Sequence, residues 1–158
     1  MTGVHEDIND VSNTRRVQRA NNRGGDSATF NTFGRQADFY LSIHTNAVGN
    51  ENNVFLSAHG LETVIHPSGA DTASETYAEI IDGEVKNLGY GQVVRSMKLI
   101  NVEVLRTTLM PSVLYEGGFF TNFTDTILLM DDMYRRRTAE CLANAVDKIY
   151  AHWRSNRL

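Results

Sequence analysis

The stretch ADFYLSIHTNA, residues 37–47, is the part of the sequence that decides the fold. Apolar and polar residues alternate through its first eight positions, which predicts a β-strand from Ala37 to His44 with one face against a core. The polar residues that follow, beginning with Thr45 and Asn46, indicate that the strand ends there, with His44 at its carboxyl end. The apolar face of this strand carries Phe39, Leu41 and Ile43.

The segments on either side alternate between strand-like and helix-like patterns. Thr72 and Glu75 have the spacing of a capping box, and Gly89 suits the end of the helix that follows. Strands that alternate with helices favour a three-layer α/β/α fold with a mainly parallel sheet, in a single domain over residues 1–158. The expected elements are a helix over 14–22, strands over 37–44, 61–66 and 112–115, a helix over 73–88, an extended segment over 102–105, a turn at Gly117–Gly118 and a helix over 131–153.

Composition excludes several classes of protein. The chain has 158 residues and a formal net charge of −4, so a general nucleic-acid-binding role has no electrostatic support. No segment approaches the roughly 20 apolar residues of a membrane span, and the polar start MTGVHEDIND does not resemble a signal peptide. The single cysteine, Cys141, falls in an apolar helical pattern, and we expect a buried thiol there.

Two residues with useful chemistry are expected at strand ends. His44 ends the first strand, and Glu116 follows the apolar run Val113–Tyr115. In open α/β sheets, sites form beyond the carboxyl ends of the strands. A histidine can bind a metal, and burial can raise the pKa of a glutamate toward the range useful for proton transfer. Taken singly, a histidine at a strand end is more often a hydrogen-bonded structural residue than a metal ligand, and a glutamate there is commonly just solvated.

The wider strings resemble a known family. ADFYLSIHTNA (37–47) is similar to the zinc-dependent N-acetylmuramoyl-L-alanine amidases, and so is LRTTLMPSVLYEGGFFTN (105–122). The resemblance implies an amidase/phosphorylase-like fold, Zn²⁺ as cofactor and peptidoglycan as substrate. It also implies cleavage of the amide between N-acetylmuramic acid and L-alanine. The expected location is the cell wall, periplasm or extracellular space, unless the protein is a phage-encoded lysin. By the same resemblance His44 binds zinc and Glu116 is the general base, while Asn46 and Arg106 contact substrate.

The sequence departs from the family pattern at the metal site. The family's other two zinc ligands are an earlier histidine and a glutamate that opens the first helix, and both should lie well upstream of His44. His5 and Glu6 are adjacent, but they lie too close to His44 to match those positions. Three interpretations remain. The first is an amidase whose ligand set is completed by further N-terminal chain, by a partner or by residues such as His5. The second is an incomplete amidase-like module that binds peptidoglycan or regulates an active amidase, and the third is a fragment with no independent role.

Overall fold

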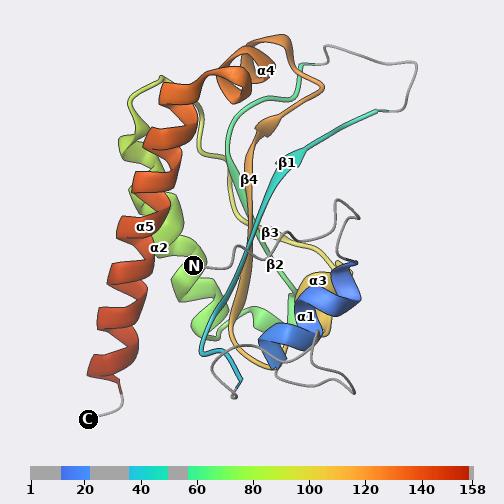
Figure 1. The fold of residues 1–158 in the computed structure, drawn as a ribbon, viewed down its shortest axis with the longest axis vertical. Coiled ribbons are helices and arrows are strands. Elements are labelled where there is room, and N and C mark those ends of the chain that lie inside the picture. The colour runs from blue at the N-terminus through green and yellow to red at the C-terminus, as the bar shows by residue number, and fades with distance from the viewer. Residues whose placement is uncertain (1–11, 22–35, 50–56, 157–158) are drawn as a thin grey trace, which may run out of the picture.

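The computed structural model describes residues 12–21, 36–49 and 57–156, and His5 and Glu6 lie outside them. Helices and strands alternate along most of the chain (Figure 1). In chain order the elements are α1 (Asn13–Asn21), β1 (Tyr40–Asn46), β2 (Glu62–Ile65), η1 (Pro67–Gly69), α2 (Ala73–Val85), η2 (Lys86–Leu88), β3 (Lys98–Leu99), α3 (Glu103–Arg106), β4 (Ser112–Phe119), α4 (Phe123–Met130) and α5 (Asp132–Ser155).

The four strands form one sheet in the order β1-β4-β2-β3. The β1–β4 and β2–β3 pairings are parallel, whereas β2 and β4 are antiparallel. The sheet is therefore mixed, with two of its three pairings parallel. β4 lies at the centre of the arrangement because it pairs with β1 on one side and β2 on the other, so its side chains meet both neighbours.

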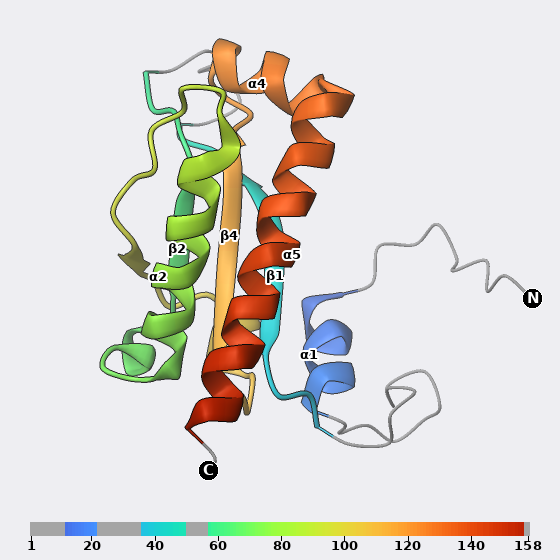
Figure 2. The same cartoon turned by 90° about the vertical axis from the view of Figure 1, so that its left-hand side faces the viewer.

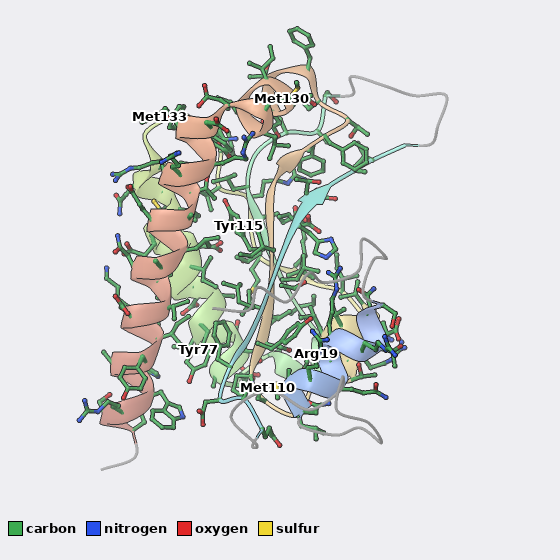
Figure 3. All side chains as sticks on the ribbon, viewed as in Figure 1. Arg19, Tyr77, Met110, Tyr115, Met130 and Met133 are labelled. Atoms are coloured by element: carbon green, nitrogen blue, oxygen red, sulfur yellow. The ribbon has the colours of Figure 1, made fainter. Side chains whose placement is uncertain are left out.

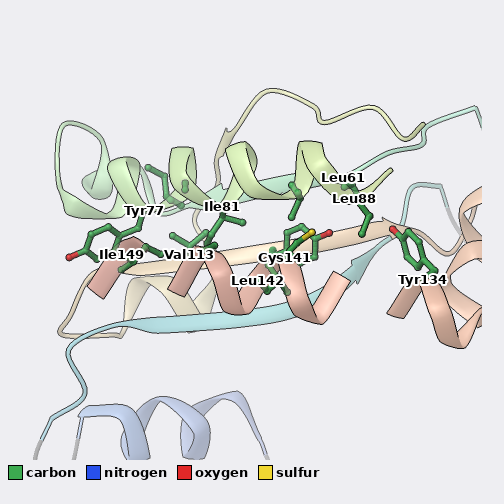
Figure 4. Close-up of a cluster of buried hydrophobic side chains, with 14 residues drawn as sticks. Leu61, Tyr77, Ile81, Leu88, Val113, Tyr134, Cys141, Leu142 and Ile149 are labelled. Atoms are coloured by element: carbon green, nitrogen blue, oxygen red, sulfur yellow. The ribbon is translucent and has the colours of Figure 1, made fainter. Parts of the chain in front are cut away.

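Helices α2 and α5 lie side by side over one face of the sheet (Figure 2). A cluster of buried apolar side chains fills the space between these helices and the strands (Figure 4). Val113 and Tyr115 of β4 contribute to it, and so does Cys141, whose thiol is buried as expected. The Tyr134 hydroxyl donates to the Gly117 carbonyl over 3.0 Å, which ties the start of α5 to β4.

Helices α1 and α3 cover part of the opposite face (Figure 1). Val17 of α1 and Leu105 of α3 pack there with Val64 of β2 and Leu114 of β4. Helices therefore lie on both faces of the sheet, and the expected α/β/α layering is confirmed. Because side chains alternate along a strand, Glu116, two residues after Leu114, lies on the same face as this second cluster.

Two local predictions were wrong. The segment 102–105 is not extended, because Glu103–Arg106 forms the short helix α3 with Val104 and Leu105 buried beneath it. The Gly117–Gly118 pair does not make a turn, because β4 continues through it to Phe119. Gly118 has a φ of +132°, a conformation that glycine adopts without strain, so the strand bends locally there without ending.

Two elements were not predicted from the sequence. The two-residue strand β3 is too short to show a period, and α4 consists of the eight residues FTDTILLM. Asn122 caps α4 by accepting from the Asp125 backbone N–H over 3.2 Å.

Tyr115 is buried in the core, whereas Met130 and Met133 lie at the exposed junction of α4 and α5 (Figure 3).

Candidate functional site

Three ionisable side chains form a row across the middle of the sheet. His44 of β1 is in register with Glu116 of β4, and Glu116 is in register with Glu62 of β2. Register partners on adjacent strands lie roughly 5 Å apart and share one face. His44 is exposed, Glu116 is partly buried and Glu62 is 5% exposed. The predicted placement of His44 and Glu116 on neighbouring strands is therefore confirmed, although each strand extends a few residues further.

A bulge in β4 brings a second row of residues onto the same face. Asn46 lies two residues after His44, but its partner Phe119 lies three residues after Glu116, so the register shifts between the two pairs. The extra residue on β4 restores the alternation so that Phe119 and Asn46 face the same way. The glycines that permit this bulge thus position the side chains that follow Glu116.

Glu62 binds donors that come from both sides of β4. Its Oε1 accepts from the Asn46 side-chain amide over 3.3 Å, and its Oε2 accepts from Arg95 Nε over 2.8 Å. Arg95 also lies 5.2 Å from the centre of the Phe119 ring, within the range of a cation–π contact. A charged carboxylate can be buried this deeply because both of its oxygens have partners.

Glu116 lies in a contrasting environment. Burial, and secondarily the charge of Glu62, raise the pKa of Glu116 to about 7. Its Oε2 atom is buried and has no hydrogen-bond partner among the described residues. A carboxyl group with a pKa near neutrality can both accept and release a proton at physiological pH, which is what a general acid–base catalyst requires.

A buried aspartate braces the end of the sheet beside this row. Asp125 Oδ2 accepts from the backbone N–H of Gly60 over 2.8 Å and from that of Phe119 over 2.9 Å. Asp125 is 2% exposed. The carboxylate therefore joins the start of α4 to the end of β4 and to the segment that leads into β2, which fixes the strands that carry Glu116 and Glu62.

Arg106, predicted to contact substrate, lies in another part of this structure. It belongs to α3, and its Nη1 donates to Asn101 Oδ1 over 3.2 Å. It borders a hollow of about 330 Å³ that also includes Ser112, the first residue of β4. Ser112 lies four residues before Glu116, about 13 Å along a strand. The structure thus brings together His44, Glu116 and Asn46, but not Arg106.

The other described histidines have local structural partners. His66 Nδ1 accepts from the Ser68 backbone N–H at the start of η1, and His59 Nδ1 lies 2.9 Å from the Ser57 carbonyl oxygen. The His152 ring packs edge-on against Tyr77. Among the residues that the structure describes, no group of three His, Cys, Asp or Glu side chains could hold a metal ion. These residues alone therefore do not fit a three-ligand zinc site.

Sequence reasoning missed Glu62 and Asp125 in this region, and it gave Arg95 less weight than Arg106 as a substrate contact. The signal for Glu62 is present, because a glutamate within the apolar run LETVI of a predicted strand must be paired if it is buried. Arg95 has no local signal, because it reaches Glu62 from 33 positions further along the chain.

Comparison with known proteins identifies the family. The profile of the family described as N-acetylmuramoyl-L-alanine amidase matches residues 1–148. The chain is similar to N-acetylmuramoyl-L-alanine amidase CwlM of Bacillus licheniformis, with 32% identity over 89% of this chain and 47% of that protein. It is also similar to the probable cell wall amidase LytH of Staphylococcus aureus, with 29% identity over 73% of this chain and 36% of that protein.

The same relationship is found among solved structures. The catalytic domain of CwlV, an N-acetylmuramoyl-L-alanine amidase from Bacillus (Paenibacillus) polymyxa var. colistinus, superposes with a TM-score of 0.70 and 25% identity. That match covers 89% of this chain and 66% of the CwlV domain. The chain spans about half the length or less of the curated relatives described above. On the strength of the family profile and these similarities, the chain belongs to the N-acetylmuramoyl-L-alanine amidase family.

Proposed function

We propose that the protein hydrolyses the amide between N-acetylmuramic acid and L-alanine in peptidoglycan, with Glu116 as the general acid–base residue. The observation that carries this proposal is the environment of Glu116. Its carboxyl group has a pKa raised to about 7 and a buried oxygen without a partner among the described residues, and it lies beside His44. The Glu116 side chain as a whole is partly exposed, so its carboxyl group can still meet a water molecule or a substrate.

The proposed reaction uses Glu116 twice. Glu116 first removes a proton from the attacking water as the water oxygen bonds to the scissile carbonyl carbon. It then donates that proton to the amide nitrogen as the carbon–nitrogen bond breaks, so the products are a carboxylic acid and a free amine. A group whose pKa lies near the working pH can perform both transfers, because neither protonation state is strongly favoured.

We further propose that His44 is one ligand of a zinc ion. Bound zinc polarises a carbonyl and lowers the pKa of water, which complements a nearby base. Because the described residues offer no three-ligand group, the remaining ligands would come from outside them. Sources for those ligands include the region of His5 and Glu6, a longer form of the protein, and a partner chain.

Peptidoglycan as substrate places the proposed activity at the cell wall. The relatives that support this location include proteins named as N-acetylmuramoyl-L-alanine amidases and as a probable cell wall amidase. Within the described ranges, no helix combines the length and apolar character needed to cross a bilayer.

A second candidate function follows from the incomplete ligand set. If no further ligands are supplied, the same fold would act as a module that binds peptidoglycan or regulates an active amidase. The deciding experiment measures the metal content of the purified protein and its hydrolysis of a muropeptide, with the products identified by mass spectrometry. Release of the stem peptide with a free L-alanine amine supports the amidase. Binding of the muropeptide without cleavage supports the module.

A further inference from the structure

Glu62 accepts hydrogen bonds from two side chains, and one of them reaches it across the central strand β4. Asn46 lies on β1 and Glu62 on β2, and β4 runs between these two strands. The 3.3 Å contact from the Asn46 amide to Glu62 therefore crosses β4 on the face that carries Glu116. Arg95 Nε donates to the other oxygen of the same carboxylate, Glu62 Oε2. Two side-chain donors thus converge on Glu62, while the neighbouring Glu116 Oε2 has no described partner.

Both donors are held in place by further contacts. The Asn46 side-chain oxygen accepts from the Ala47 backbone N–H over 2.8 Å, so the Asn46 nitrogen must be the atom that faces Glu62. Arg95 donates through Nη1 to the His59 carbonyl oxygen over 3.4 Å and packs over the Phe119 ring. Reversal of the Asn46 amide would set its nitrogen against the Ala47 N–H, so the observed orientation is the one that satisfies every group.

Only a carboxylate can satisfy both donors at position 62. A carboxylate has two acceptor oxygens, whereas a glutamine side chain has one acceptor and one donor. A glutamine there would place an N–H group against the Asn46 amide or against Arg95 Nε. One donor would then lose its acceptor. Glu116 is the register partner of Glu62 on the same face, so its carboxyl group is an alternative acceptor.

We propose that Glu62 is the positioning residue of this site: it engages the Asn46 amide and the Arg95 guanidinium, and so keeps both donors off the Glu116 carboxyl. A hydrogen bond from either donor would occupy a lone pair that the Glu116 carboxyl needs to accept the proton of water. Glu62 therefore acts through two neighbours and need not touch the substrate. This inference rests on the proposed function, because it assigns Glu62 a part in the proton transfer that Glu116 is proposed to perform.

The structure also suggests a variant that should rescue the loss. In the double variant Glu62→Gln/Asn46→Asp, the carboxylate moves from β2 to β1. The new carboxylate at position 46 can accept from the Ala47 N–H and from the new amide at position 62, and the oxygen of that amide can accept from Arg95 Nε. Every hydrogen bond is restored with one polarity reversed, and the net charge is unchanged. Glu62→Gln alone keeps only one of the two hydrogen bonds from Asn46 and Arg95.

The experiment combines spectroscopy with kinetics on the parent, Glu62→Gln and the double variant. The matched control is Glu84→Gln, because Glu84 is also a buried glutamate with a cationic partner, Lys148, but lies on α2 away from the site. Nitrogen-15 NMR follows the side-chain N–H signals of Asn46 and Arg95. Thermal denaturation confirms that each variant folds. Muropeptide hydrolysis gives kcat and KM.

We expect Glu62→Gln to shift at least one of the two N–H signals and to lower kcat by about tenfold or more, with little change in KM. The double variant has no side-chain N–H at position 46, so its readouts are the Arg95 Nε–H signal, which should return to its parental position, and kcat, which should exceed that of Glu62→Gln. Glu84→Gln should change neither the signals nor the rate. Unchanged Asn46 and Arg95 signals in Glu62→Gln would overturn the proposal, and so would a rate equal to that of Glu84→Gln. If the parent hydrolyses no muropeptide, the proposed function fails, and the N–H signals still decide whether Glu62 holds the two donors.

Discussion

His44 and Glu116 are register partners on the parallel strands β1 and β4, so one substrate molecule can reach both side chains. Their proposed roles differ, since His44 would hold a metal ion and Glu116 would move a proton. The two roles can therefore be separated by mutation, because loss of a ligand and loss of a base affect different measurements.

We expect Glu116→Gln to abolish amide hydrolysis while the fold stays intact. The two side chains are close in shape, but an amide cannot accept the proton of water at neutral pH. General acid–base help is typically worth ~10²–10⁴ in rate, so a muropeptide assay should show the loss clearly. In the complete form of the protein that holds zinc, His44→Ala should remove both activity and bound metal. Glu116→Gln that retained half of the parental rate would mean that Glu116 is structural.

Zinc binding by the isolated chain should be weak. The described residues offer His44 but no group of three ligands, and a ligand set below three cannot hold zinc tightly. We therefore expect zinc to be lost during dialysis against a chelator, as measured by atomic emission. His66→Ala is the matched control for His44→Ala, because the His66 ring caps η1 and has no proposed part in metal binding. Stoichiometric zinc after dialysis would contradict this prediction and would direct attention to residues such as His5.

The sequence predicted the strand positions of His44 and Glu116 better than it predicted the directions of the strands in the sheet. The alternation around His44 and the apolar run before Glu116 are local patterns, and local patterns determine which residues point together from a strand. The direction of β2 has no such signature, because an apolar run such as LETVI fits a parallel or an antiparallel neighbour equally well. The mixed character of the sheet therefore emerged only from the structure.

The remaining differences have similar physical causes. Helix α4 is short and apolar, and short apolar runs do not distinguish a helix from a strand. Helix α3 is a single turn whose two apolar residues, Val104 and Leu105, are selected by packing under α1. The contacts of Glu62 with Asn46 and Arg95 depend on a tertiary arrangement of three segments, which no local pattern reports.

Asp82 should make stability depend on pH. Burial is the main cause that raises the pKa of Asp82 to about 6, although the Thr63 hydroxyl donates to its carboxylate. The folded state therefore holds the proton more tightly than the unfolded state, whose pKa for aspartate is about 4. Between about pH 4 and pH 6 the stability contributed by this side chain falls as pH rises, and the loss is complete above that window.

We expect Asp82→Asn to remove this dependence. Near pH 4 the variant and the parent should unfold at similar urea concentrations, because the parental carboxyl is then largely neutral in the folded state and only about half ionised in the unfolded state. At pH 7–8 the variant should be more stable by roughly 1–2 kcal/mol, since its amide still accepts from Thr63 and carries no charge. This is less than the full pKa shift would give, because solvent partly screens this half-buried group. A stability difference that stays constant across this pH range would show that Asp82 is ionised in the folded protein throughout.

Two glycines give a matched test of the packing that supports the site. Gly60 leads into β2 with a φ of +99°, and its N–H donates to the buried Asp125 carboxylate. A Cβ at Gly60 would lie 2.4 Å from the Val93 carbonyl oxygen, which itself accepts from the Leu61 N–H over 2.8 Å and so cannot move away freely. Gly60→Ala should therefore cost about 2 kcal/mol or more of unfolding free energy, from backbone strain and the clash together.

Gly83, inside α2, has nothing within 4 Å of its added Cβ, so Gly83→Ala should instead stabilise the protein by about 0.5–1 kcal/mol. Urea denaturation of the two variants measures both changes against the parent. Equal stability of Gly60→Ala and the parent would mean that the segment between Gly60 and Val93 is not as closely packed as the structure describes.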